Sequence, residues 1–578
     1  MLSDSTALRA PAAARPLGPV TRRTASLHPP RAWSPTTLAL LAAAWLAAVA
    51  NWPLWRAIAA LPEMGGARGL LFGLAMCLIV AALTALPLLL FAWRPLLKPV
   101  VAIFLLVAAV AAHFMGSYGV LVDSSMLRNV MQTDVREAGA LLSLPLLLNL
   151  LLVAGLPIVW LWRQPLRAVA GRRLALSNLA AGAAALGLAL ALTLLAFQSL
   201  SGTMRNHKSL RYLVNPLNSV YALGLLAREA QARPAGPPTP IGLDARALAM
   251  PTGARPPLVL LVVGETARAD HFSLNGYPRP TNPELARFTD LVSFGRVQSC
   301  GTSTAASLPC MFSSLDRSAF LDRAQDSENL LDLLQRAGLA VLWLDNQSGC
   351  KGLCDRVPHA STSEPTPGRT SAPAALCRAG ECLDEALLYD LDARLAALDP
   401  QRRARGTVLV LHQMGSHGPA YGERSPAASK PFQPECRSNV LQDCSNADLV
   451  NAFDNSIVYT DLVLGRAIAW LQGHAQSFDA ALLYVSDHGE SLGENGLYLH
   501  GMPYAIAPQA QKQVPMILWT SPAARASLAL DGACVEHGRD AALSHDHLFH
   551  TVLGLARVRA TEYRRELDAL AACRGSGG

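Results

Sequence analysis

The stretch PLVLLVVGETAR, residues 257–268, decides the fold of the second half of the chain. A short continuous apolar run that stops at Gly264 and Glu265 is typical of a strand buried on both faces of a sheet. Helical patterns such as 328–338 and 451–472 separate it from further apolar runs. This alternation predicts a doubly wound α/β domain on a parallel sheet. Its other strands are expected at AVLWL 340–344, TVLVLH 407–412, AALLYVS 480–486 and VPMILW 514–519.

Acidic and imidazole side chains stand where three of these strands end. Glu265 follows the first, Asp487 and His488 follow the strand of ALLYVSDHGE, and His417 comes shortly after TVLVLH. The carboxyl ends of parallel strands meet at one edge of a sheet, where ligands bind. Carboxylate oxygens and imidazole nitrogens are zinc ligands. The sequence therefore predicts a metal site at this edge.

The motif CGTSTAASLPC, residues 300–310, supplies a hydroxyl for such a metal to activate. Gly301 and the small residues after it are typical of a loop that opens a helix, and backbone N–H groups at a helix start bind anions such as phosphate. A hydroxyl becomes a nucleophile only when a base or a metal promotes its ionisation. From the residues alone, Thr302, Ser303 and Thr304 are all candidates.

The first two hundred residues have a different composition. Of the 578 residues in the chain, 51% are hydrophobic and 16% charged, whereas soluble domains carry about a quarter charged residues. Five apolar segments are each close to the ~20 residues that a membrane-spanning helix needs. They are near 36–52, 68–91, 99–115, 140–161 and 175–199.

Basic residues around these segments predict the orientation in the membrane. They gather in the tail before the first span, in the turn after the second (Arg94 and Lys98), and in the turn after the fourth (residues 163–173). Because Lys and Arg concentrate on the cytoplasmic side, five spans place everything after residue 200 on the outer face. Topology also explains the net charge of +7, and no nucleic-acid-binding signature is present. We therefore expect no nucleic-acid partner.

Four parts follow from these patterns. Residues 1–35 are expected to form a cytoplasmic basic tail, 36–200 a five-helix transmembrane domain, 201–256 a linker with bridging helices, and 257–578 an extracytoplasmic catalytic domain.

Cysteine usage supports this topology. Ten of the eleven cysteines come after residue 299, and eight of them fall in close pairs, which indicates disulfides in an oxidising compartment. Cys534 and Cys573 remain as a possible fifth pair, and Cys77 is alone in an apolar run. The close pairs are Cys300 with Cys310, Cys350 with Cys354, Cys377 with Cys382, and Cys436 with Cys444.

The loop after the third span, residues 117–142, has helical spacing from Ser125 to Glu137. Asn129, Thr133 and Glu137 recur every four residues, so they would share one helix face. That face is either the solvated side of an amphipathic helix lying on the membrane or a polar surface that binds a lipid headgroup.

Taken together, the motifs VVGETAR, CGTSTAASLPC, GSHGP, SDHGESLGENGLYLHG and RNVMQTD resemble those of the phosphoethanolamine transferases of Gram-negative envelopes. This family includes the mobile colistin-resistance enzymes and belongs to the alkaline phosphatase-like superfamily, whose catalytic domains have a sulfatase-type sheet. The resemblance extends from the five spans to SHDHLFHTVLGL, residues 544–555. It implies an inner-membrane, multi-pass protein with its catalytic domain in the periplasm.

The resemblance assigns roles to the candidate residues. It implies that Thr304 is the nucleophile, and that Glu265, Thr304, Asp487 and His488 bind a zinc ion. A second zinc ion or the incoming phosphate would bind at His417, His500 and Lys351. The lipid headgroup would contact Asn129, Thr133 and Glu137.

The implied reaction is ping-pong. Phosphoethanolamine would pass from phosphatidylethanolamine to Thr304 and then to a phosphate of lipid A in lipopolysaccharide, which would lower susceptibility to polymyxins. The alternatives are transfer to a core sugar of lipopolysaccharide, phosphoglycerol transfer by an enzyme of the same fold, and a non-catalytic membrane sensor or scaffold. We expect the protein to be a monomer.

Overall fold

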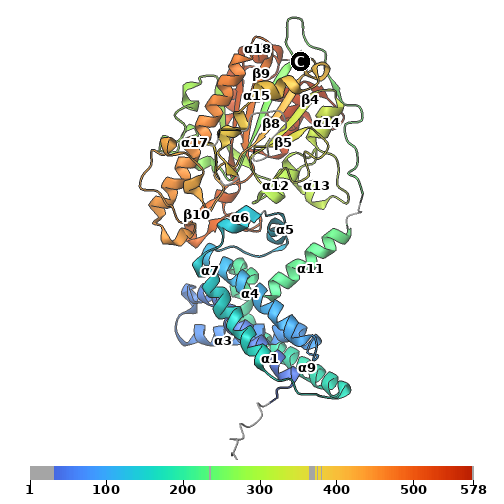
Figure 1. Ribbon diagram of the computed structural model, residues 1–578, viewed down its shortest axis with the longest axis vertical. Coiled ribbons are helices and arrows are strands. Elements are labelled where there is room, and N and C mark those ends of the chain that lie inside the picture. The colour runs from blue at the N-terminus through green and yellow to red at the C-terminus, as the bar shows by residue number, and fades with distance from the viewer. Residues whose placement is uncertain are drawn as a thin grey trace, which may run out of the picture.

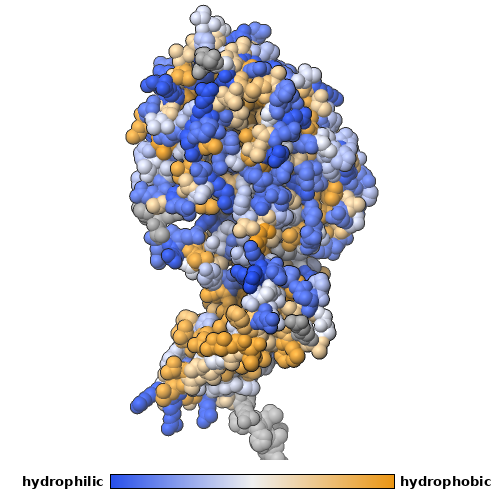
Figure 2. All heavy atoms as spheres, turned by 180° about the vertical axis from the view of Figure 1, so that it is seen from behind, coloured by the Kyte–Doolittle hydropathy of each residue, from blue (hydrophilic) through white to orange (hydrophobic). Residues whose placement is uncertain are grey.

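A computed structural model describes residues 32–133, 135–232, 236–362, 372–373, 375–378 and 381–575. An N-terminal group of helices lies below a larger α/β domain, and α5 and α6 lie between the two (Figure 1). Apolar residues gather on the surface of the helical part, whereas the α/β domain is mainly hydrophilic outside (Figure 2). Most of the expected basic tail 1–35 falls outside the described residues.

The helical part corresponds closely to the predicted spans. Among the described residues, four helices are long and apolar enough to cross a membrane, and a bent pair brings the number to five if it counts as one span. The bent pair is α1 (Pro35–Ala48) with α2 (Trp52–Ala59). The other four are α3 (Gly66–Leu90), α4 (Leu97–Tyr118), the segment Leu144–Arg163 and α9 (Gly171–Leu195). The segment Leu144–Arg163 consists of α7 (Leu144–Asn149), the π-helical η2 (Leu150–Gly155) and α8 (Leu156–Arg163).

The first predicted span, 36–52, is not one straight helix. α1 covers most of it, and α2 begins only at its last residue and continues beyond it, at 42° to α1 across a short break. Pro53 lies in the first turn of α2. Proline is favoured in a first turn because an N–H there would have no partner within the helix, and its missing N–H prevents α1 from continuing through this position. Asn51 stabilises the bend because its side-chain amide donates to the Leu46 carbonyl at 2.9 Å.

The predicted cytoplasmic segments meet at one end of the helical part. Trp33 donates from Nε1 to the Gln164 side chain at 3.1 Å, and Lys98 donates from Nζ to the Gln164 carbonyl at 2.8 Å. Residues before the first span, after the second and after the fourth are therefore neighbours, as the charge pattern requires.

Short helices connect the two parts. The predicted continuous helix from Ser125 to Glu137 is wrong: α5 covers Ser124–Gln132, and α6 covers Val135–Ala140. Thr133 is extended (φ −68°, ψ 131°), and its hydroxyl donates to the Asn129 carbonyl at 2.9 Å, which ends the helix. The linker contains α10 (Phe197–Asn206) and α11 (Leu217–Ala232).

An eight-stranded sheet forms the centre of the α/β domain, in the order β13-β3-β12-β9-β2-β8-β4-β5. The strands β9, β2, β8 and β4 run parallel, as predicted, and β5, which the sequence did not predict, is parallel to β4. The bounds are β2 (Pro257–Gly264), β3 (Leu291–Gln298), β4 (Ala340–Asp345), β5 (His359–Ser361), β8 (Thr407–His412), β9 (Asp479–Ser486), β12 (Gln513–Thr520) and β13 (Leu543–Ser544).

The sheet is mixed rather than wholly parallel, because β12 runs antiparallel to both β9 and β3. The connection from β9 to β12 contains only the hairpin of β10 (Ser491–Leu492) and β11 (Tyr498–Leu499) and short 3₁₀ turns. No helix crosses back over the sheet in this connection, so β12 starts at the edge where β9 ends and must run in the opposite direction. His488 and His500 lie in this same connection, which begins at the edge of the sheet where β9 ends.

Helices cover both faces of the sheet, and each face has its own core. One core joins alternate residues of β2 to α12, α14 and α20, and the other joins the intervening residues to α15 and α17. The helices are α12 (Thr304–Met311), α13 (Arg317–Asp322), α14 (Leu330–Arg336), α15 (Leu391–Ala397), α16 (Pro400–Arg403), α17 (Asn446–Gly473), α18 (Pro522–Ser527), α19 (Gly532–His537) and α20 (Asp546–Leu555).

All four predicted cysteine pairs are disulfides, and Cys534 with Cys573 forms a fifth. Cys77 is free. Three minor sheets complete the domain: β1 (Arg246–Ala247) with β14 (Val558–Arg559), β6 (Cys377–Arg378) with β7 (Glu381–Cys382), and β10 with β11.

Candidate active site

The polar strand ends meet at one edge of the sheet. Glu265 follows β2, and Asp487 and His488 follow β9 on the neighbouring strand. β8 and β4 lie on the other side of β2 and lead to His417 and Gln347. Since these four strands are parallel, their carboxyl ends bring all of these side chains to the same edge.

Glu265, Asp487 and His488 form a compact, fully buried cluster. One ligand atom from each lies within 4.8 Å of the others. His488 Nε2 is 3.3 Å from Glu265 Oε1 and 3.3 Å from Asp487 Oδ2. Neither of these two oxygens has a hydrogen-bond partner among the described residues, although both are buried. Unpaired buried carboxylate oxygens beside an imidazole nitrogen fit a bound cation, which would compensate their lost hydration.

The charges of this cluster also favour a cation. Burial and the adjacent negative charge of Glu265 raise the pKa of Asp487 to about 6. Burial likewise opposes ionisation of Glu265, but the adjacent His488 imidazole lowers the pKa of that carboxyl below its usual range. Two buried carboxylates that repel each other are stabilised by positive charge, which is what a divalent metal would supply.

Thr304 is the hydroxyl residue that faces this cluster. Its Oγ1 donates to Glu265 Oε2 at 3.0 Å and lies 3.4 Å from His488 Nε2. Thr304 is the first residue of α12, which follows β3 at the active edge of the sheet. The Thr302 hydroxyl instead donates to the Met502 carbonyl at 2.6 Å. Geometry thus separates two residues that the sequence left as equal candidates.

A small cavity above Thr304 brings most of the remaining candidates together. Gln347 also borders it, and donates from Nε2 to Glu265 Oε2 at 3.0 Å. The rings of His417 and His500 are 5.6 Å apart between centroids. The cavity is lined by Asn129, Gln132, Thr133, Thr304, Gln347, Ser348, Lys351, His417 and His500.

The helical part of the chain supplies one wall of this cavity. Asn129 and Gln132 come from α5, and Thr133 from the break that follows it. The end of α5 also accepts a hydrogen bond, because Lys351 Nζ lies 3.4 Å from the Gln132 carbonyl. The third predicted headgroup residue, Glu137, is on α6, and its side chain lies outside the described residues.

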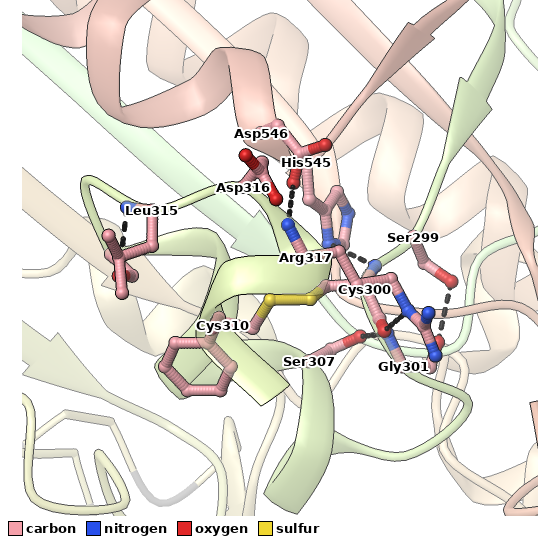
Figure 3. The surroundings of a disulfide bond; sticks show 12 residues. Ser299, Cys300, Gly301, Ser307, Cys310, Leu315, Asp316, Arg317, His545 and Asp546 are labelled. Atoms are coloured by element: carbon pink, nitrogen blue, oxygen red, sulfur yellow. Dashed lines mark hydrogen bonds between the residues drawn. A yellow bond between two sulfur atoms is a disulfide. The ribbon is translucent and has the colours of Figure 1, made fainter. Parts of the chain in front are cut away.

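His545 is a site residue that the sequence did not reveal. The pattern SHDHLFH predicts histidines that pack and cap a helix, and α20 does follow, but His545 does not cap it through its side chain. Its Nδ1 instead accepts from the Cys300 backbone N–H at 3.1 Å (Figure 3). Its Nε2 lies 2.9 Å from the Ser486 carbonyl. His545 therefore links the loop before Thr304 to the strand before Asp487. Backbone partners leave no sequence signal.

These features define a class of enzyme. A buried carboxylate–imidazole cluster at the carboxyl edge of the sheet, with a hydroxyl on the adjoining helix start, suits metal-assisted transfer of a phosphoryl or sulfuryl group through that hydroxyl. The chain matches the family described as Sulfatase over residues 257–558 and the family described as Phosphoethanolamine transferase EptA/EptB over residues 79–230.

Individual relatives cover most of the chain. Phosphoethanolamine transferase EptA of Salmonella typhimurium is 41% identical over 484 residues, 82% of this chain and 85% of the relative. Phosphatidylethanolamine transferase Mcr-1 of Escherichia coli is 37% identical over 550 residues, 92% of this chain and 97% of the relative. The solved structure of integral membrane lipooligosaccharide phosphoethanolamine transferase A from Neisseria meningitidis superposes with a TM-score of 0.87 at 35% identity, covering 93% of this chain and 98% of that one.

The chain therefore belongs to the EptA/Mcr family of phosphoethanolamine transferases, within the alkaline phosphatase-like superfamily. It is a multi-pass inner-membrane enzyme whose catalytic domain lies in the periplasm.

Proposed function

We propose that this enzyme transfers phosphoethanolamine from phosphatidylethanolamine to a phosphate of lipid A, through a phosphothreonine at Thr304 and with zinc as its metal. The observation that supports this most directly is the position of Thr304 Oγ1, 3.0 Å from Glu265 Oε2 and 3.4 Å from His488 Nε2 in a buried cluster. The similar solved structure that is named for lipooligosaccharide phosphoethanolamine transfer supports the acceptor class.

In the first half-reaction, the Thr304 oxygen attacks the phosphorus of the donor, and diacylglycerol leaves. Glu265, Asp487 and His488 would hold the zinc ion, with Thr304 beside it. When bound, zinc lowers the pKa of a ligated hydroxyl and neutralises charge on a phosphoryl group. The backbone N–H groups at the start of α12 face an anion at this position.

The residues around the cavity position the donor. His417, His500 and Lys351 would bind phosphoryl oxygens, or a second metal in the case of the histidines, and a histidine can return a proton to the leaving alcohol. Asn129, Thr133 and Glu137 would bind the ethanolamine headgroup. A phosphate oxygen of lipid A then attacks the phosphothreonine, which restores the Thr304 hydroxyl and completes the ping-pong cycle.

The covalent intermediate gives the sharpest test. The full-length protein is incubated with phosphatidylethanolamine without acceptor, and peptide mass spectrometry then locates the added group. We expect phosphoethanolamine on Thr304 in the wild type and none in Thr304→Ala. The control is Thr302→Ala, which should still be modified on Thr304, because the Thr302 hydroxyl donates to the Met502 carbonyl. Modification of Thr302, or labelling that persists in Thr304→Ala, would exclude the mechanism.

The acceptor and the metal need separate measurements. Expression in a Gram-negative host, followed by mass spectrometry of lipid A, should show added phosphoethanolamine for the wild type and not for Thr304→Ala, together with lower polymyxin susceptibility. Modification of core sugars, or addition of phosphoglycerol, would select an alternative acceptor or donor. Metal analysis of the purified protein should find zinc that Asp487→Asn loses.

A further inference from the structure

A second, larger hollow adjoins the cavity over Thr304. It is a groove of about 550 Å³ between α5, the start of α12 and the segment around α13. Gln132 and Lys351 line both the groove and the smaller cavity, so the two are neighbours with a shared wall. Thr302 and Ala305, on either side of the nucleophile, also line the groove. A molecule in the groove would therefore lie next to Thr304.

The groove has an excess of positive charge. Five basic residues and two acidic residues, Asp326 and Glu328, line it. Three of the basic side chains pair with carboxylates: Arg128 with Glu229, Arg323 with Asp326, and Arg356 with Asp332. The side chains of the remaining two, Arg317 and Lys351, form no ion pair with a described carboxylate, although the backbone N–H of Arg317 donates to Asp546 Oδ1 at 2.8 Å.

Arg317 is held in place without being neutralised. Its Nε donates to the Cys300 carbonyl at 2.7 Å (Figure 3). Its guanidinium carbon lies 3.6 Å from the centre of the Tyr504 ring. Neither terminal nitrogen makes a hydrogen bond to a described residue. Lys512 Nζ lies 5.2 Å from the same ring and adds a second positive charge nearby. A planar guanidinium with both terminal nitrogens available suits two-point binding of a phosphate.

Lys351 is fixed at the junction of the two hollows. It has a left-handed backbone (φ 50°) in the short loop closed by Cys350 and Cys354. Its Nζ donates to the Ser348 hydroxyl at 2.9 Å and lies 3.4 Å from the Gln132 carbonyl. Lys351 therefore contacts the reaction cavity, whereas Arg317 lines only the groove.

We propose that this groove binds the acceptor through a second anionic group, with Arg317 contacting a phosphate of the acceptor that does not react. The inference rests on the proposed function and extends it. The preferred acceptor carries two phosphates, one that approaches Thr304 beside Lys351 and one that binds Arg317. The donor has one phosphate, which Thr304 itself attacks, so the donor does not need Arg317.

The position of the groove suits a lipid. Residues of α5 and of the catalytic domain line it. α5 lies on the side of the domain that faces the membrane helices (Figure 1). Leu321, on its wall, is 53% exposed and offers an apolar contact beside the cations. An anionic head with acyl chains on one side matches this combination of charge and apolar surface.

The test compares two half-reactions and two acceptors with the full-length protein in detergent. The donor step is the burst of diacylglycerol released from phosphatidylethanolamine as Thr304 is loaded. The acceptor step is transfer to bisphosphorylated or monophosphorylated lipid A. In Arg317→Ala we expect KM for bisphosphorylated lipid A to rise about tenfold or more, as for loss of a charge-assisted hydrogen bond, while the donor burst falls by less, because His545 still binds the Cys300 N–H.

The interaction between variant and acceptor identifies the contact. Wild type should prefer bisphosphorylated over monophosphorylated lipid A, and Arg317→Ala should lose that preference. Leu321→Glu places a negative charge in the groove without changing a contact of Cys300. It should raise KM for bisphosphorylated lipid A more than KM for monophosphorylated lipid A. Arg287→Ala removes an arginine that is 70% exposed on the same domain and should change neither step.

Two results would overturn the proposal. One is an equal effect of Arg317→Ala and Leu321→Glu on both acceptors, and the other is a donor burst that falls as much as acceptor transfer. A wild type without any donor burst would instead refute the proposed function, so the two failures are distinguishable.

Discussion

Replacing His545 with phenylalanine tests whether one buried histidine positions the nucleophile. The ring is fully buried and joins the Cys300 N–H to the Ser486 carbonyl. Phenylalanine fills similar space but leaves both backbone groups unpaired, at about 1–3 kcal/mol each. We therefore expect a loss of about 4 kcal/mol in the free energy of unfolding.

The matched control is His550→Phe. His550 is buried on α20, the helix that begins directly after His545. Its Nδ1 accepts from the Arg564 N–H at 3.1 Å, while its Nε2 has no partner among the described residues. One lost hydrogen bond predicts about half the destabilisation, and no effect on activity per folded molecule. His545→Phe should lower stability more and also lower the rate at which Thr304 is loaded, at least tenfold by the standard for misplaced reacting groups.

Two measurements separate stability from positioning. Urea unfolding of the full chain in detergent gives the free energies, and the loading rate is measured well below the unfolding temperature. Hydrogen exchange of the peptide containing Cys300 should accelerate in His545→Phe only. The reasoning fails if His545→Phe loads Thr304 at the wild-type rate, or if the Cys300 amide stays equally protected.

The pH dependence of the free energy of unfolding gives an independent test of the role of His545. Burial lowers the pKa of His545 to about 4, against about 6.5 in the unfolded chain, so the unfolded state binds the proton more tightly. Stability from this group is complete above about pH 6.5 and falls as the pH drops toward 4, by at most about 3 kcal/mol. His545→Phe should lose this part of the slope; an unchanged slope would contradict the assignment.

Three further predictions concern the surroundings of the site. Gly415 has φ +53°, and a Cβ there would lie 2.6 Å from the Glu265 carbonyl oxygen, so Gly415→Ala should lower stability by at least about 2 kcal/mol in urea unfolding and reduce zinc content. Gln347→Ala removes the amide that orients Glu265 and should weaken zinc affinity about 10- to 100-fold in chelator competition, with unchanged zinc affinity contradicting this role. Opening the ten-residue Cys300–Cys310 loop with a double serine variant should cost about 3 kcal/mol in the same unfolding assay, and a loss below about 1 kcal/mol would show that the loop is ordered without its disulfide.

The sequence predicted those features that depend on length and local pattern. The spans at 68–91 and 175–199 coincide with α3 and α9, because a bilayer sets a minimum apolar length. The strand ends at Glu265 and Asp487 meet because parallel neighbours must end at one edge. Both inferences needed only the spacing of apolar residues and the types of residue that follow them.

Features that depend on nonlocal partners were not predictable in this way. The direction of β12 follows from a connection without a crossover helix, which no apolar run records. The helix expected through Thr133 breaks because its hydroxyl competes for the Asn129 carbonyl, although the four-residue spacing continues. His545 has backbone partners that are 245 and 59 residues away along the chain.

Two parts of the chain line the cavity over Thr304: the α/β domain and the segment around α5, next to the membrane helices. The cluster of Glu265, Asp487 and His488 and the Thr304 hydroxyl lie wholly within the α/β domain. Asn129 on α5 and Thr133 directly after it line the cavity from the side of the membrane helices. A detached α/β domain would thus keep the proposed metal ligands and Thr304 but lose one wall of the cavity. Anchoring therefore does more than raise the local concentration of lipid: it completes the cavity, so changes at the junction of Lys351 with Gln132 should alter donor binding without altering the metal.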